Sequence, residues 1–82
     1  MKEEKLKEEV RRGDEILKHQ LEFYKKNNIP VHIIRTDERF YNGSILELAG
    51  DMLILDDIKL GAMPIHFIEI KVLERYTKEG RP

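Results

Sequence analysis

Apolar residues in the N-terminal part of the chain recur with the period of a helix. Leu17, Leu21 and Tyr24 are spaced four and three residues apart, and Leu6 and Val10 continue the same stripe toward the N-terminus. An apolar stripe with this period is typical of an amphipathic helix that packs one face against a core. The pattern therefore predicts helix within residues 2–27.

Gly13 interrupts this helical pattern, and Asp14 directly after it can cap a new helix. We expect a firm helix from Asp14 to Lys26, preceded by a charged segment, residues 1–13, that forms a frayed or separate helical extension. Pro30 cannot continue a helix because it lacks the backbone N–H, so the helix should end at the preceding asparagines.

The remaining apolar runs are short and predict β-strands. We expect strands at Val31–Thr36, Arg39–Leu48, Met52–Asp56 and Ala62–His66, and a last half-buried strand in which Ile68, Ile70 and Val72 alternate with polar residues. Ala49, Gly50 and Asp51 form a compact turn signal between the second and third strands, which indicates a hairpin.

Gly43 lies in the middle of the longest predicted strand. A glycine at such a position usually marks a β-bulge or a sharp bend, and a long bent strand allows a small sheet to curl into a barrel. The sequence therefore predicts a mainly β fold, with an N-terminal α-helix followed by a small, strongly bent, five-stranded barrel. The domain should span residues 14–76, with the helix at 14–26, the barrel at 31–74 and a flexible tail at 77–82.

Composition narrows the range of functions. The chain has 82 residues, enough for one domain, no cysteine, and 15 basic against 16 acidic residues. Its N-terminus is charged and no apolar run approaches the length of a membrane span, so we expect a soluble, cytoplasmic protein without membrane contact. Since the net charge is −1, any binding of phosphate groups must come from local clusters of basic residues.

Two segments resemble the motifs of the Sm-like family of RNA-binding proteins. Arg39, Tyr41, Gly43 and Ile45, followed by an apolar strand, resemble the first Sm motif, G-R-x-F/Y-x-G-x-L. Residues 65–70 resemble the second motif, I-R-G-x-x-I, and also the Lys-His segment of the bacterial Hfq branch. The resemblance covers roughly residues 15 to 73. It implies an Sm/SH3-like barrel, RNA as a partner, and self-association into a hexameric or heptameric ring.

The same resemblance implies which residues contact RNA. It places His66 at the inner rim of a ring, where a histidine can stack on a base or donate a hydrogen bond, although a strand histidine without any ligand is an equally good interpretation. Arg39, Asp51, Lys25 and Lys26 are the other candidate RNA-binding residues.

The residues that select uridine in the family are not matched here. The corresponding positions fall near Ala49 and Met52, with Asp51 displaced, so we expect weakly selective contacts with single-stranded RNA. Glu15 and Glu22 share the helix with the candidate lysines and should weaken their field.

Pro64 bears on assembly, because a proline lacks the donor that strand pairing between subunits would use. We expect its missing N–H to be tolerated, since an apolar edge left bare would invite aggregation.

The sequence offers little chemistry for catalysis. Ser44 lies in a strand without a nucleophile-elbow motif, the three histidines have no metal-ligand spacing, and Asp56 and Asp57 should point to opposite faces and form a solvated loop entry. We expect no enzyme activity and no cofactor. The alternative function is a protein–protein interaction module of Sm/SH3-like fold that has lost the RNA pocket.

Overall fold

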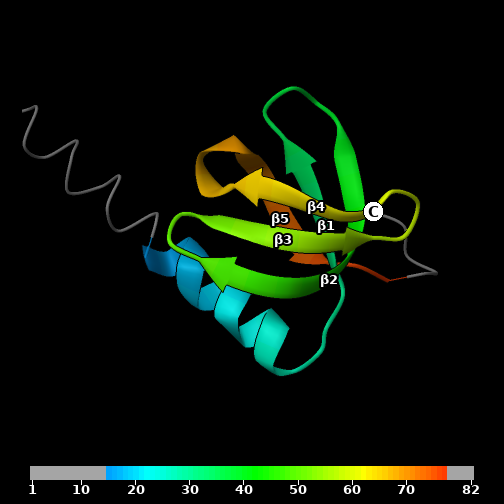
Figure 1. The fold of residues 1–82 in the computed structure, drawn as a ribbon. Coiled ribbons are helices and arrows are strands. Elements are labelled where there is room, and N and C mark those ends of the chain that lie inside the picture. Colours follow the sequence, from blue (N-terminus) through cyan, green and yellow to red (C-terminus); the bar gives the residue numbers. More distant parts are fainter. Residues whose placement is uncertain (1–14, 78–82) are drawn as a thin grey trace, which may run out of the picture.

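The computed structural model describes residues 15–77, and the tail beyond them, residues 78–82, and the predicted N-terminal extension lie outside this range. A helix at 15–26 precedes five strands and one short 3-10 helix (Figure 1). In chain order these elements are β1 (Val31–Arg35), β2 (Phe40–Ala49), β3 (Met52–Asp57), β4 (Gly61–His66), η1 (Phe67–Glu69) and β5 (Ile70–Arg75).

The five strands form one antiparallel sheet in the order β4-β3-β2-β1-β5. The long strand β2 joins the two halves of the sheet, pairing with β1 through its first residues and with β3 through its later ones. The sheet curls strongly, with the helix packed along one side (Figure 1). This confirms the predicted fold class, an N-terminal helix followed by a small bent barrel.

The helix completes the hydrophobic core. Leu21 is fully buried in one cluster with residues from β1, β3 and β4, and Leu17 and Tyr24 pack against that cluster. The buried residues of the cluster are Leu21, Val31, Ile33, Tyr41, Ile45, Leu53, Leu55, Ile65 and Phe67. The predicted apolar stripe is therefore confirmed at Leu17, Leu21 and Tyr24, while its members at positions 6 and 10 lie outside the described residues.

Gly43 is required by a close approach of two backbones. It pairs in register with Val31 on one side and Asp57 on the other, and a Cβ atom on it would lie 2.0 Å from the carbonyl oxygen of Asp56. The expected bulge lies elsewhere, because the register between β2 and β3 shifts between Ile45 and Glu47. Gly43 thus lets β3 approach β2, and the extra residue that disturbs the ladder comes three positions later.

The expectation for the last strand was wrong at its start. Ile68 lies in η1 and is 86% exposed, whereas Phe67 beside it is buried. The chain must cross from one outer strand of the sheet to the other at this point, and the short 3-10 turn that makes the crossing replaces the alternation of a strand. Regular strand begins only at Ile70.

We expect Gly43→Ala to destabilise the fold by about 3 kcal/mol, the upper part of the range for overpacking, because the added methyl group meets backbone rather than a movable side chain. Urea denaturation would measure the loss. Ser44→Ala, at the exposed neighbouring position, is the control and should change stability by less than about 0.5 kcal/mol. Equal stability of the two variants would show that the close approach is not required.

Candidate functional site

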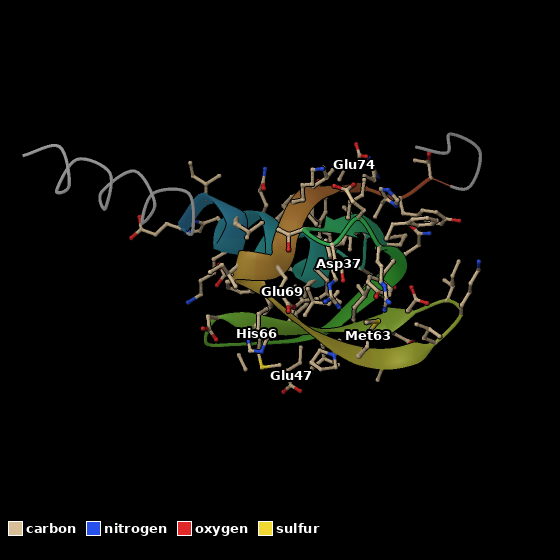
Figure 2. All side chains as sticks on the ribbon, turned by 90° about the horizontal axis from the view of Figure 1, so that it is seen from above. Asp37, Glu47, Met63, His66, Glu69 and Glu74 are labelled. Atoms are coloured by element: carbon tan, nitrogen blue, oxygen red, sulfur yellow. The ribbon has the colours of Figure 1, made fainter. Side chains whose placement is uncertain are left out.

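His66 ends β4 and is exposed at one end of the sheet. It lies opposite Met52 in register, and the N–H of the next residue, Phe67, donates to the carbonyl of Asp51 over 2.8 Å. The structure therefore brings His66 and Asp51, two of the predicted site residues, to the same end of the β3–β4 pair. Glu47 lies opposite Ile54 in register and Ile54 lies opposite Pro64, so the side chains of Glu47 and His66 are on the same face of the sheet (Figure 2).

Glu69 fixes the backbone at this histidine. Its Oε1 accepts the His66 N–H over 3.1 Å, and its Oε2 lies 3.7 Å from Nη2 of Arg35 in β1. The Arg35 guanidinium also contacts Asp37, at 3.2 Å, and lies over the ring of Tyr41. This network ties η1 to the β1–β2 hairpin, and it leaves Arg35 engaged with carboxylates of its own chain.

Lys25 and Lys26 lie in the last turn of the helix. They line a shallow hollow together with Glu22, Glu47 and Leu48, so they lie beside the second half of β2. Two of the five lining residues are acidic, which weakens the attraction of this hollow for phosphate groups. The prediction that acidic residues on the helix accompany the lysines is therefore confirmed for Glu22.

Arg39 lies away from the other candidates. It precedes β2, whereas Asp51 follows it, so the two occupy opposite ends of a ten-residue strand. The backbone N–H of Arg39 donates to Oδ1 of Asp37, and its carbonyl accepts from the Arg35 N–H, both within the β1–β2 hairpin. The predicted site residues therefore form one pair, His66 with Asp51, while the two lysines and Arg39 lie at separate places.

Asp57 was predicted as part of a solvated loop entry, and that prediction was wrong. Its carboxylate is buried and accepts hydrogen bonds from the backbone N–H groups of Asn42, Lys59 and Leu60, each at 2.9 Å. Asp56 beside it is exposed, so the two carboxylates do point to opposite faces. Part of the signal is local, since an aspartate at the start of a turn can accept the backbone N–H two residues on, as Asp57 does from Lys59.

The environment of Asp57 lowers its pKa. Burial acts to raise the pKa of this carboxyl, but the N–H groups of Leu60, Asn42 and Lys59 and the positive charge of Lys59 stabilise the carboxylate more, so the pKa lies below its ordinary value of 3.8. Asp57 thus connects β2, through Asn42, to the β3–β4 loop, and it does so in its charged form.

A second buried polar residue, His32, was not predicted. It lies on the outer side of β1 and is 5% exposed. Its Nδ1 donates to Oδ1 of Asn42, and its ring centroid lies 5.8 Å from that of Phe40. Sequence alone gave it no role. Its partners show that it is a hydrogen-bonded structural residue of the β1–β2 pair.

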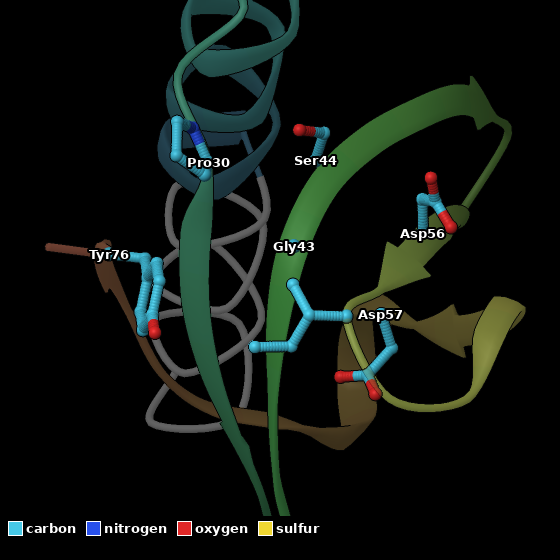
Figure 3. A pocket seen from close by; sticks show the side chains of 7 residues that line it. Pro30, Gly43, Ser44, Asp56, Asp57 and Tyr76 are labelled. Atoms are coloured by element: carbon cyan, nitrogen blue, oxygen red, sulfur yellow. The ribbon is translucent and has the colours of Figure 1, made fainter. Parts of the chain in front are cut away.

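A groove of about 630 Å³ opens on the outer side of the sheet (Figure 3). Its lining residues come from both ends of the β-region and are Pro30, Gly43, Ser44, Asp56, Asp57, Ile58 and Tyr76. The sequence did not predict this groove, because its walls come from segments that are far apart in the chain.

Comparison with protein-family models finds no match, and comparisons with curated proteins and with solved structures find none either. Within residues 15–77, no three His, Cys, Asp or Glu side chains gather in a way that could hold a metal ion. The helix of the described region is not long and apolar enough to cross a membrane.

We expect Asp57→Asn to lower the free energy of unfolding at pH 7 by about 1–3 kcal/mol, since a buried charged acceptor is lost. The pH dependence should change as well. Because folding lowers the pKa of Asp57, its carboxylate stabilises the fold above the unfolded-state value of about 3.9, and this contribution disappears as the pH falls through the folded-state value.

Urea denaturation between pH 7 and pH 2 would test this, with Asp56→Asn as the exposed control. The parent protein and the control should lose stability on acidification more steeply than Asp57→Asn. A variant with the same acid dependence as the parent would contradict the role given to this carboxylate.

Proposed function

We propose that the protein is an Sm-like RNA-binding protein of the cytoplasm that assembles into a ring and makes weakly selective contacts with single-stranded RNA. The observation that carries the proposal is the exposed His66 beside the turn that holds Asp51, at one end of a five-stranded sheet whose two outer strands can pair with further copies.

The free edge of β4 is poor in donors. The Phe67 N–H donates to the Asp51 carbonyl, and hydrogen-bonded and non-hydrogen-bonded pairs alternate along an antiparallel ladder. The backbone groups of Ala62, Pro64 and His66 therefore face outward, and of these three Ala62 has an N–H directed to the open edge. Pro64 has no N–H, and the N–H of His66 donates to the Glu69 carboxylate. This edge therefore offers mainly carbonyl acceptors.

The free edge of β5 has the complementary property. The Tyr76 N–H donates to the Pro30 carbonyl over 3.0 Å, so by the same alternation Leu73 and Arg75 turn both their N–H and their C=O groups outward. The β5 edge therefore supplies the donors that the β4 edge lacks. An edge poor in donors pairs badly with a copy of itself and better with an edge that has them, so β4 of one subunit and β5 of the next are suited to head-to-tail pairing. Such pairing closes into a ring when the rotation allows it. Pro64 would cost this pairing one donor on an edge that serves mainly as acceptor.

His66 suits contact with RNA bases better than with phosphates. An imidazole can stack on a base and donate a hydrogen bond, whereas the acidic Glu47 on the same side of the sheet disfavours a dense phosphate cluster (Figure 2). A ring would repeat the weak contact once in each subunit, and repetition raises the overall affinity. Since few cations contribute, the affinity should depend only shallowly on salt.

We expect native mass spectrometry at micromolar concentration to give a closed hexamer or heptamer. Arg75→Pro should shift the mass toward monomer, because it removes one outward donor of β5 while a proline is tolerated on an outer strand. Arg75→Ala keeps the N–H and should assemble like the parent. A monomeric parent, or a proline variant that assembles normally, would contradict the proposed edge pairing.

We expect His66→Ala to weaken the binding of short U-rich and A-rich RNA by about fivefold to a hundredfold, the range for one lost stacking contact. The oligomer mass and melting temperature should not change, since the side chain is exposed. Fluorescence anisotropy at two salt concentrations would measure the binding, with His19→Ala on the helix as the control. If the folded parent binds neither RNA at low salt, the protein-interaction alternative takes over.

A further inference from the structure

The groove on the outer side of the sheet exists because β2 separates from β1. The β1–β2 pairing ends at the pair of Val31 with Gly43, and the residue before Val31 is Pro30, which cannot donate to a ladder. From Ser44 onward β2 keeps β3 as its partner on one side and has no strand of the described chain on the other. The gap between the separating strands is the groove.

Its walls are apolar on two sides. Pro30 and the half-buried Tyr76 lie on one side of β2 (Figure 3). Ile58 of the β3–β4 loop, which is 62% exposed, also lines the groove. The floor contains Gly43 and the buried Asp57. A side chain placed between Tyr76 and Ile58 would cover apolar surface that is otherwise exposed to water.

One end of the groove is acidic. Ser44 and Asp56 are opposite each other in the β2–β3 register, and both are exposed. No ion pair involves the Asp56 carboxylate within the described part of the chain, whereas the neighbouring Asp57 is satisfied by backbone N–H groups. This end of the groove therefore favours a cation and repels a phosphate.

We propose that the groove binds an extended peptide segment of a partner protein, with an apolar side chain between Tyr76 and Ile58 and a Lys or Arg at Asp56 and Ser44. β2 loses its β1 partner after Gly43, and the helix residues lie beside this strand at Glu47 and Leu48, so a segment can add to the edge between these points, as in recognition by strand addition. The acidic end of the groove disfavours RNA as the occupant. The groove is open and lined mostly by exposed residues, so it suits an extended chain segment better than a small molecule, which needs an enclosed pocket. The peptide site does not depend on the proposed RNA binding.

The test is an NMR titration in which amide chemical shifts of the ¹⁵N-labelled protein are followed as short peptides are added. Each peptide contains Leu-Pro and one arginine, and the three peptides differ in having no, one or two alanines between them. We expect amide shifts concentrated at Ser44, Asp56, Ile58 and Tyr76. A peptide with glutamate in place of arginine should bind at least about threefold more weakly, as should the protein variant Asp56→Asn, in line with the loss of one exposed ion pair.

Variants of the apolar wall separate binding from folding. Ile58→Ser removes an exposed side chain and should weaken the arginine peptide by about fivefold or more without lowering the melting temperature. Glu22→Gln, on the helix, is the control for Asp56→Asn. It removes one negative charge as well, and it should leave peptide binding unchanged. His66→Ala should also leave it unchanged, which keeps this result distinct from RNA binding.

Several outcomes would overturn the proposal. No shift with any of the peptides at millimolar concentration would do so, as would shifts centred on Lys25 or His66. Shifts at the groove on dilution of the protein alone would assign it to a second copy of this chain. Shifts at the groove with short RNA, but not with peptide, would assign it to nucleic acid.

Discussion

The rest of the structure depends on the close approach of β2 and β3 at Gly43. The backbone of Gly43 lies where any Cβ would collide with the Asp56 carbonyl, and directly beside it Asp57 accepts the N–H of Asn42. Together these contacts hold the end of β3 against β2 at the point where β2 leaves β1. A sheet that is pinned at this point and separated just beyond it must curl, and the curl encloses the core that Leu21 of the helix completes.

The same constraint explains why the two candidate binding places lie apart. Separation of β2 from β1 opens the groove beside Gly43, whereas His66 lies at the other end of the β3–β4 pair, against the β2–β3 turn. The Glu69 carboxylate fixes the backbone at His66, because it accepts the His66 N–H and also forms an ion pair with Arg35. The bent sheet therefore presents a histidine at one end and an acidic, apolar groove at the other, which suits two ligands of different chemistry.

Charge is distributed rather than clustered. Arg35 and Lys71 are paired with carboxylates, and Lys25 and Lys26 share their hollow with Glu22 and Glu47. These described residues form no broad basic surface, so the proposed RNA binding would draw its affinity mainly from repetition of a small contact in the proposed ring. The proposed assembly would use the outer strands, because β4 offers mainly acceptors and β5 has outward donors.

The sequence by itself determined the elements and the fold class. The stripe of Leu17, Leu21 and Tyr24 and the short β-rich runs predicted the helix and all five strands to within one or two residues, because both periodicities are local. It failed at Ile68 and Asp57 and did not predict the groove. Tertiary structure decided those features. The chain at η1 must cross between the two outer strands, and the Asp57 carboxylate accepts the N–H of Asn42, fifteen residues away. The groove walls come from segments that are far apart in the chain. Contacts between distant segments depend on how the sheet curls, and a local pattern does not contain that information.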